Sequence, residues 1–340
     1  MPAPKAVIFG CKSHQLTAEE RQLFSATRPF GLILFARNID TPRQVMDLSA
    51  EFRACVGRAE APVLIDQEGG RVARLKSPHW EEYPAAARLG RLYEHDAVSG
   101  IAAAKLLGRL LAWQLRPFGI TVNCAPVADL RFDGADNVIG DRAFSANPEA
   151  VAKLARAVCD GLMAGGVFPV IKHLPGHGRA TADTHKEKAV VDTPLEELRK
   201  TDFVPFSALR DMPFGMTAHV TYTAIDPDNS ASLSPKVIQV IRRQIKFSGL
   251  LMSDDLTMKA LTGDVAALAK GVLKAGCDLA LYCKHDVDEM ARIAEAVRPM
   301  SADAVLRWQK ARKSLRRLKL FDPSLARAEF RQLLSHAPKF

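Results

Sequence analysis

The stretch NPEAVAKLARAVCDGLMAGGVFPVIKH, residues 147–173, contains one complete unit of the fold. Its first part has apolar residues at helical spacing, with Asn147 placed as N-cap, proline at the first helical position, and Gly165-Gly166 placed as a stop. The run PVIKH at 169–173 is typical of a strand that is buried on both faces of a parallel sheet. A helix that leads directly into such a strand predicts an α/β fold.

The same alternation continues through most of the chain and predicts a single-domain (β/α)8 barrel rather than an open doubly wound sheet. The predicted helices occupy 41–56, 97–115, 147–166, 194–211, 234–246 and 264–276. The eight predicted strands are AVIFG (6–10), GLILFA (31–36), PVLIDQ (62–67), GITVNCAPV (119–127), PVIKH (169–173), PFGMTA (213–218), GLLMSDD (249–255) and DLALYC (278–283).

Composition restricts the class of protein. The 340 residues are 48% hydrophobic and 25% charged, which excludes disorder as the main state. The six cysteines are scattered without a CxxC pair, as expected for reduced core thiols. No apolar run approaches the ~18 residues that a bilayer span requires, and the N-terminal stretch lacks a signal-peptide cleavage site. We therefore expect a cytoplasmic protein.

Positive charge is concentrated at the C-terminal end. The chain has 47 Lys+Arg against 38 Asp+Glu, and residues 301–340 alone have ten against three. Within this segment Val305, Trp308, Ala311, Leu315 and Leu318 form one apolar helical stripe. We expect a catalytic barrel at 1–300 and a basic helical appendage at 301–340 that packs on it. The alternative, a helix that binds nucleic acid or an anionic membrane, is disfavoured because no second basic patch or nucleic-acid motif accompanies it.

Polar residues gather where the predicted strands end. The carboxyl ends of the strands of a (β/α)8 barrel face one another across its mouth, where active sites are built. Six strands that end this way together predict an enzyme. The residues concerned are Asp66 after the third strand, Asn123 and Asp129 after the fourth, Lys172 and His173, His219, Ser253, Asp254 and Asp255, and Tyr282 and Lys284.

The loop KHLPGHGRATADTH, residues 172–185, carries three histidines. Asp183 and His185 are close enough in sequence for a turn to bring them into contact, and a carboxylate beside an imidazole makes a general acid/base. A metal site is the alternative, with His173, His177, His185, His219 and Asp254 as its possible ligands. It is disfavoured because the first two strands end without an HxH motif and because Lys172 would place a positive charge beside the metal.

Several blocks, taken together and in order, resemble one family. KHLPGHG with ADTH, DQEGGRVAR upstream and MSDDLTM downstream are similar to the β-N-acetylhexosaminidase branch of glycoside hydrolase family 3. LILFARNI, VIGDRAF and MTAHVTYTAIDP match the same pattern, so the resemblance covers about residues 30 to 285. Two departures are Leu174, where the family commonly has Phe, and Asp141, where Glu is frequent; neither has a catalytic role in the pattern.

The resemblance implies a monomeric exo-enzyme without metal or organic cofactor that removes terminal β-linked N-acetylglucosamine with retention of configuration. In a bacterial cytoplasm it implies muropeptide substrates, in which the sugar is linked to 1,6-anhydro-N-acetylmuramic acid, and a place in cell-wall recycling and the β-lactam response. By the motif match, Asp254 would be the nucleophile, His185 the acid/base and Asp183 its orienting partner, and Asp66, Arg74, Arg142, Lys172 and His173 would bind the sugar.

Three points stay open at this stage. Asp255, next to Asp254, is expected to cap or pair within its loop. Because His185 is neutral after it donates its proton, the same site could accept phosphate in place of water, which would make the protein a phosphorylase. A barrel that has lost activity and binds an anionic partner through its basic tail is the alternative outside catalysis, but it would not require the complete acid/base and nucleophile set.

Overall fold

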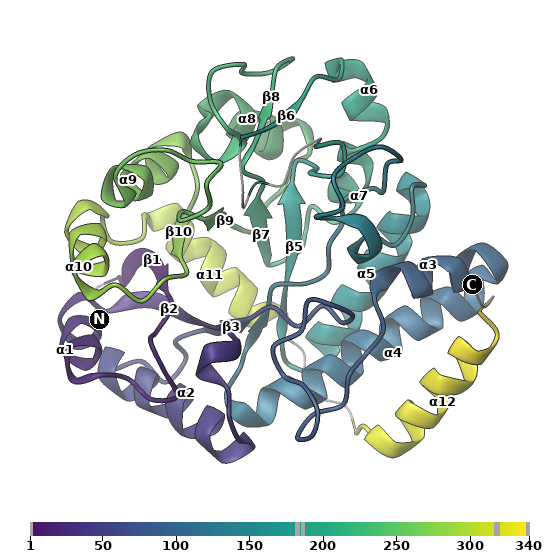
Figure 1. Cartoon of the computed structure of the whole chain (residues 1–340), viewed down its shortest axis with the longest axis horizontal. Coiled ribbons are helices and arrows are strands. Elements are labelled where there is room, and N and C mark those ends of the chain that lie inside the picture. Colours follow the sequence, from purple (N-terminus) through teal and green to yellow (C-terminus); the bar gives the residue numbers. More distant parts are fainter. Residues whose placement is uncertain (1–2, 181–183, 185–187, 316–319, 338–340) are drawn as a thin grey trace.

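Eight parallel strands close into a barrel in the order in which they occur along the chain, with strand β10 pairing back to β1 (Figure 1). The structure is a computed structural model that describes residues 3–180, 184, 188–315 and 320–337. The predicted (β/α)8 fold is confirmed. Each predicted apolar run corresponds to one barrel strand: β1 Lys5–Phe9, β2 Pro29–Leu34, β3 Val63–Ile65, β4 Val122–Asn123, β5 Phe168–Leu174, β7 Phe214–Thr217, β9 Leu250–Asp255 and β10 Leu279–Tyr282.

Helices surround the barrel, and local capping sets where they begin. The Asn147 side chain accepts hydrogen bonds from the backbone N–H groups of Glu149 and Ala150, and the Thr41 hydroxyl accepts one from Gln44. None of the helices in the described ranges is both long and apolar enough to cross a bilayer. The helices are α1 Ala18–Thr27, α2 Pro42–Val56, α3 Ala86–His95, α4 Ala97–Leu115, α5 Pro148–Ala164, α6 Leu195–Lys200, α7 Phe203–Ala208, α8 Pro235–Gln239, α9 Val265–Ala275, α10 Val287–Ala296, α11 Ala302–Ser314 and α12 Pro323–Ser335.

Two local features differ from the prediction. The stretch 194–211 contains two short helices, α6 and α7, instead of one. Pro205 explains the break, because its ring would clash with the carbonyl group four residues earlier, at Thr201. A parallel pair of strands outside the barrel, β6 (Ala189–Val191) and β8 (Val220–Tyr222), was also not predicted. It follows β5 and β7 in the chain and therefore adds to the mouth of the barrel.

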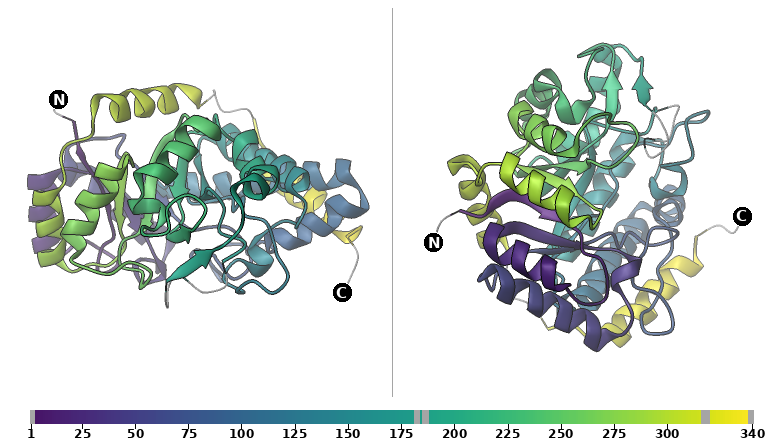
Figure 2. Two further views of the ribbon diagram at one scale, coloured as in Figure 1. Left: turned by 90° about the horizontal axis from the view of Figure 1, so that it is seen from above. Right: turned by 60° about the vertical axis from the view of Figure 1, so that its left-hand side comes forward.

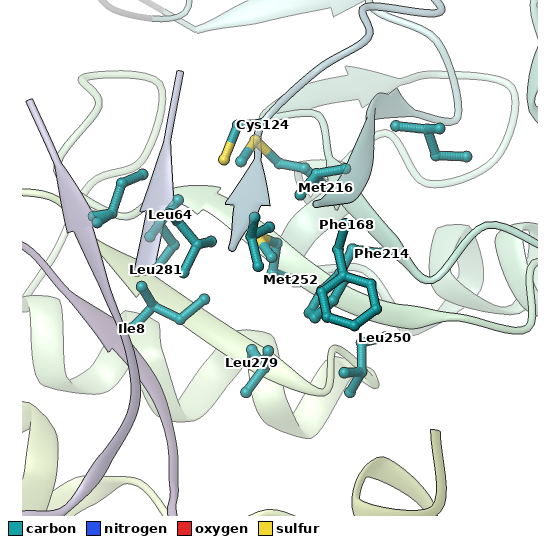
Figure 3. Packing of buried hydrophobic residues seen from close by; sticks show 14 of the residues in the cluster. Ile8, Leu64, Cys124, Phe168, Phe214, Met216, Leu250, Met252, Leu279 and Leu281 are labelled. Atoms are coloured by element: carbon teal, nitrogen blue, oxygen red, sulfur yellow. The ribbon is translucent and has the colours of Figure 1, made fainter. Parts of the chain in front are cut away.

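The interior of the barrel is filled by side chains from the strands (Figure 3). Ile8, Leu64 and Leu279 are fully buried, and the aromatic rings of Phe168 and Phe214 contact each other at a centroid distance of 5.7 Å. Helices cover the outer face of the same strands, so both faces of each strand are shielded from solvent. This double burial explains why the strands appear in the sequence as continuous apolar runs without alternation.

Helix α11 closes the end of the barrel where the strands begin (Figure 2, left). Trp308 lies 5.3 Å from Phe30 between ring centroids, 5.6 Å from Phe168 and 5.9 Å from Phe214, residues at the starts of β2, β5 and β7. Of the predicted stripe, Trp308 and Ala311 are buried, Val305 and Leu315 are half-buried, and Leu318 lies outside the described residues. The C-terminal segment contains two helices, α11 and α12, where one was expected.

Replacement of Trp308 by Ala should lower the free energy of unfolding by about 3–5 kcal/mol, because it removes a ring packed against three aromatic residues. Urea denaturation followed by circular dichroism measures this loss. The control is Leu306→Ala, on the same helix and 62% exposed, which should change stability by less than about 0.5 kcal/mol. Equal stability of the two variants would contradict the closing role of Trp308.

Candidate active site

One pocket lies at the carboxyl ends of the barrel strands and contains most of the predicted site. Asp66 follows β3, Lys172 and His173 belong to β5, and Asp254 belongs to β9. Apolar side chains, including Phe35 and Met216, form the rest of the wall. Asp183 and His185 lie outside the described residues. The predicted site residues that line the pocket are Asp66, Arg74, Arg142, Lys172, His173 and Asp254.

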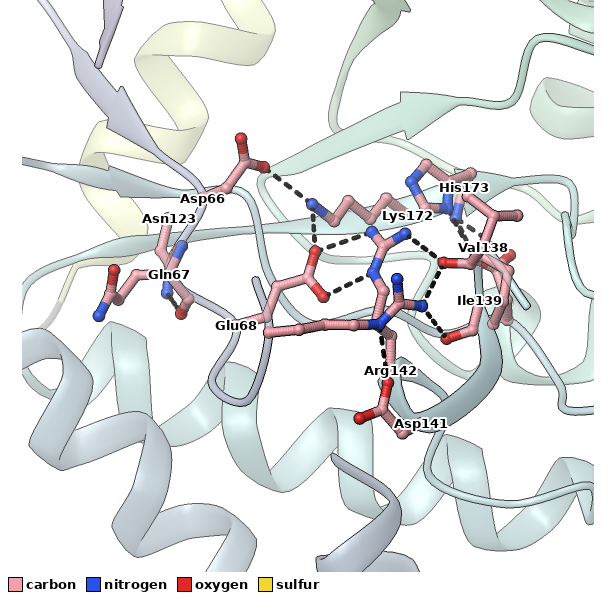
Figure 4. A network of polar contacts seen from close by, with 12 residues as sticks. Asp66, Gln67, Glu68, Asn123, Val138, Ile139, Asp141, Arg142, Lys172 and His173 are labelled. Carbon is pink, nitrogen blue, oxygen red and sulfur yellow. Dashed lines mark hydrogen bonds and ion pairs between the residues drawn. The ribbon is translucent and has the colours of Figure 1, made fainter. Parts of the chain in front are cut away.

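Lys172 is the centre of a buried ionic network (Figure 4). Its ammonium nitrogen lies 2.9 Å from Oδ1 of Asp66 and 2.7 Å from Oε1 of Glu68, and its side chain is 3% exposed. Arg142 binds Glu68 through two bonds, with Nε 2.9 Å from Oε2 and Nη2 2.8 Å from Oε1. Arg74 adds a contact of 3.2 Å to Asp66. The network therefore joins the loop after β3 to β5 and to the loop that carries Arg142.

The charges in this network stabilise one another. Burial alone would raise the pKa of Glu68, but Lys172 and Arg142 outweigh burial and hold that pKa at about 2. Burial acts on Asp66 in the same way, and Lys172 and Arg74 bring its pKa below the usual value for Asp. Burial would lower the pKa of Lys172, and the two carboxylates raise it instead. All three groups are thus charged at neutral pH, as donors and acceptors in fixed positions for a ligand with many hydroxyl groups.

Glu68 was missed at the sequence level, although it lies two residues after Asp66 in the block DQEGGRVAR. The loop that carries both acids is braced from inside by the buried Gln67. The Gln67 amide donates to the Leu75 carbonyl at 2.9 Å, and its oxygen accepts from the backbone N–H of Arg74 at 2.8 Å. We refer to residues 66–75 as the sugar-site loop, because the motif match predicts that Asp66 and Arg74 bind the sugar; its internal bonds make it one compact unit.

A second loop is clamped to the rim of the pocket by Arg71. Its guanidinium group pairs with Asp141 at 2.9 Å and donates to the carbonyl groups of Asn137 and Val138. Asp141 and Val138 are labelled in Figure 4. Asp141, one of the two departures from the family pattern, is therefore an ion-pair partner at the rim. The clamp holds the turn that presents Arg142 to Glu68.

Asp129 positions two histidines, His173 of β5 and His177 in the loop after β5. This fully buried carboxylate accepts the Nδ1–H of His173 at 2.7 Å and the backbone N–H of His177 at 2.7 Å. Burial would raise the pKa of Asp129, but His173 and these hydrogen bonds lower it. Because Nδ1 of His173 donates to Asp129, the tautomer and the orientation of the ring are fixed. His177 lines the pocket, and burial, followed by the charge of His173, lowers its pKa to about 4.

Asp254 and Asp255 have different environments. The oxygens of Asp255 accept from the backbone N–H of Thr257 and of Cys283, both at 3.1 Å, and from the Thr257 hydroxyl at 2.7 Å. Asp255 is thus engaged in structural bonds, as expected. Asp254 lines the pocket and accepts the Asp255 N–H at 2.8 Å.

The carboxyl group of Asp254 is charged at neutral pH. Burial would raise its pKa, but the neighbouring imidazoles of His219 and His173, the Asp255 amide and Lys172 together lower it. Asp254 therefore presents an anionic oxygen to the pocket at the end of a strand.

The arrangement of the His, Cys, Asp and Glu side chains can be compared with the alternative prediction of a metal site. In the part of the chain that the structure describes, no three His, Cys, Asp or Glu side chains are grouped so that they could hold a metal ion. His219 uses both ring nitrogens within the protein, with Nδ1 2.7 Å from the Ser232 hydroxyl and Nε2 donating to the Asp255 carbonyl at 3.0 Å. Burial lowers its pKa, so His219 is a neutral support for the end of β9.

Known proteins that resemble this chain in sequence or structure include β-hexosaminidases and NagZ. The chain is 37% identical to a β-hexosaminidase of Bordetella avium over 83% of its length and 81% of the relative. It is 38% identical to a β-hexosaminidase of Aromatoleum aromaticum, with coverage of 87% and 84%. NagZ from Neisseria gonorrhoeae in complex with N-trifluoroacetyl-D-glucosamine has a similar structure, with a TM-score of 0.85, 33% identity and coverage of 99% and 97%.

The family itself is identified by its sequence profile. The profile described as the glycosyl hydrolase family 3 N-terminal domain matches residues 6–318, which is most of the chain. This match confirms the resemblance inferred from the ordered motifs and the prediction of a glycosidase. The protein belongs to glycosyl hydrolase family 3.

Proposed function

We propose that this enzyme is a retaining exo-β-N-acetylglucosaminidase. The observation that carries the proposal is a charged carboxylate, Asp254, in the same pocket as the buried network of Asp66, Glu68 and Lys172. The β-hexosaminidase relatives, and the NagZ neighbour that binds an N-acetylglucosamine derivative, support the choice of sugar.

The proposed reaction proceeds by double displacement. Asp254 attacks the anomeric carbon while the protonated His185 gives its proton to the departing glycosidic oxygen, which leaves a covalent glycosyl-enzyme ester. Asp183 orients the imidazole and stabilises its cation. Water then attacks the anomeric carbon, His185 removes a proton from it, and the Asp254 carboxylate is released. Two inversions give net retention, and no step requires a metal or organic cofactor.

A histidine replaces the second carboxylate of most retaining glycosidases in this scheme. A His–Asp pair has a pKa near neutrality without the deep burial that raises the pKa of a glutamic acid to the same range. A histidine as the acid/base adds no further negative charge to a pocket that already contains the carboxylates of Asp66, Glu68 and Asp254.

The sugar is held by the remaining groups. Asp66 is the more exposed of the two network carboxylates, at 14% against 8% for Glu68, and accepts hydrogen bonds from sugar hydroxyls. Lys172, Arg74 and Arg142 donate to the sugar, and His173 offers the ring nitrogen that does not face Asp129. Glu68 keeps Lys172 and Arg142 in place.

The biological substrate we propose is a muropeptide fragment in which N-acetylglucosamine is linked to 1,6-anhydro-N-acetylmuramic acid. The enzyme would act as a monomer in the bacterial cytoplasm, in cell-wall recycling, and so affect the response to β-lactams. It would need neither a nucleic acid nor a membrane partner. Residues 1–300 would form the catalytic unit, and 301–340 its helical appendage.

A covalent adduct tests the nucleophile. Brief incubation with a 2-acetamido-2-deoxy-5-fluoro-glucosyl fluoride should add one N-acetylhexosamine-type unit to the wild type, as measured by intact-protein mass spectrometry, because Asp254 forms an ester that hydrolyses slowly. Asp254→Asn should show no adduct, and Asp47→Asn, which changes an exposed carboxylate on α2, should label like the wild type. Labelling of Asp254→Asn would overturn the assignment. Release of an N-acetylglucosamine 1-phosphate in phosphate buffer would show that the same site acts as a phosphorylase.

The pH profile of kcat/KM tests the acid/base residue. Because the pKa of Asp254 lies below the usual value for Asp, this carboxylate stays ionised through the weakly acidic range, and activity should persist there. On the alkaline side activity should fall as His185 loses its proton, above the ordinary imidazole pKa of about 6.5, because Asp183 stabilises the protonated ring.

His185→Ala should remove the alkaline limb and reduce kcat by about 10²–10⁴-fold on a natural disaccharide, with a smaller loss on substrates whose leaving group is activated. His79→Ala, at an exposed histidine, is the control and should keep the wild-type profile. Normal turnover of the disaccharide by His185→Ala would exclude this histidine as the acid.

A further inference from the structure

Helix α12 lies beyond residue 318, where the match to the family profile ends, and packs beside α4 (Figure 1). Its inner face buries Ala326, Phe330 and Leu334. This face contacts a segment far away in sequence, residues 81–83. The ring of Phe330 meets Tyr83 edge to face at 6.0 Å, and both residues are buried.

Two ion pairs strengthen the contact between α12 and the 81–83 segment. Nε of Arg327 lies 2.8 Å from one carboxylate oxygen of Glu81, and Nη2 of Arg331 lies 2.7 Å from the other. On its other side, the Glu81 carbonyl accepts a hydrogen bond from the Gln114 side chain of α4 at 3.1 Å. The 81–83 segment is thus fixed between two helices.

The same segment lies directly against the sugar-site loop. The backbone N–H of Gly70 donates to the Tyr83 carbonyl at 2.8 Å. Gly69 and Gly70 have positive φ angles of 103° and 57°. A Cβ atom on Gly69 would lie 2.5 Å from the Pro84 carbonyl oxygen, and a Cβ atom on Gly70 would lie 2.7 Å from Cβ of Ala85. At this distance the backbones of the two segments are in contact, with no room for a side chain between them. A shift of the 81–83 segment therefore displaces the glycine turn.

The glycine turn is continuous with the ligand-facing acids. Glu68 precedes Gly69, and its N–H donates to the Val72 carbonyl at 2.9 Å, which closes the turn. Gln67 braces the rest of the loop from inside. Because the loop is one unit, a displacement at Gly70 reaches Asp66, Glu68 and Arg74. Asp66 and Glu68 pair with Lys172 and Arg142 at distances of 2.7–2.9 Å, and Arg74 pairs with Asp66 at 3.2 Å.

We infer that α12 is a positioning element of the active site, in which Phe330 and Glu81 act as positioning residues that hold the sugar-site loop in its binding geometry. This role deepens the proposed function and rests on it, since it assumes that Asp66 and Arg74 bind the sugar. The C-terminal segment would thus contribute to substrate binding indirectly, since none of its described residues lines the pocket.

Steady-state kinetics on a chromogenic β-N-acetylglucosaminide tests the inference in the full-length enzyme. Phe330→Ala should raise KM about tenfold and Glu81→Gln about threefold, with kcat within about twofold of the wild type, because binding contacts are displaced and the reacting groups are not. Glu81→Gln keeps the side-chain size and tests the proposal should Phe330→Ala fail to fold.

Two controls separate positioning from general stability. Leu325→Ala changes a residue of α12 that is 70% exposed. Glu51→Gln removes an ion pair between α2 and Arg21 of α1, at a carboxylate whose exposure, 27%, is close to the 30% of Glu81. Both should keep the wild-type KM. A rise in KM in the controls equal to that in the variants would overturn the inference.

Hydrogen–deuterium exchange gives a readout that does not depend on turnover. The segment 66–74 should exchange faster in Phe330→Ala and Glu81→Gln than in the wild type and both controls, because the Gly70 amide loses its fixed acceptor. Unchanged exchange in both variants overturns the inference, as does an unchanged KM in an active enzyme. A wild type that cleaves no β-N-acetylglucosaminide would instead refute the proposed function, and the exchange experiment would still decide whether α12 holds the loop.

Discussion

The buried ammonium group of Lys172 determines the architecture of the active site. A cation at 3% exposure is tolerated only when opposite charges and hydrogen bonds replace its water, and removal of one partner from such a network costs about 3–5 kcal/mol. Asp66 and Glu68 supply those charges, and Arg142 in turn satisfies Glu68. These contacts oblige three segments that are distant in sequence to meet at one point. The positions of Asp66, Glu68 and Arg142 in the pocket therefore depend on the same electrostatic balance.

Barrel strands position Asp254, Lys172 and His173, whereas the proposed acid/base residue is in a segment that the sequence predicts to be a loop. Asp254 is placed by β9, a strand with partners on both sides, so the proposed nucleophile is held rigidly. Lys172 and His173 are consecutive residues of β5, where the register with β7 shifts between Lys172 and Leu174. Such an irregularity re-aims side chains, which allows two neighbouring residues to line one pocket. The proposed acid/base, His185, follows β5 in the sequence.

The fold and much of the site could be predicted from the amino-acid sequence, because both depend on local patterns. Strands buried on both faces appear as apolar runs, and parallel strands bring their carboxyl ends to one mouth, so the sequence alone groups Asp66, Lys172 and Asp254. The partnership of Glu68 with Arg142 and that of Asp129 with His173 depend on contacts across 74 and 44 positions, which no spacing rule reveals. The division between α6 and α7 was readable, since Pro205 marks it. The predicted pair Asp183 and His185 lies outside the described residues and stays a prediction.

The positive charge of the C-terminal segment has a structural explanation that its composition alone does not give. Arg307 of α11 pairs with Asp278 at the start of β10, and Arg327 and Arg331 of α12 pair with Glu81. Arg312 stacks over the ring of Trp308, 5.9 Å from its centroid, at the closed end of the barrel. Acidic groups for three of the ten cations of this segment, Arg307, Arg327 and Arg331, are thus supplied by the rest of the chain. For these three arginines, the positive charge in the sequence corresponds to contacts that fasten the C-terminal helices to the barrel.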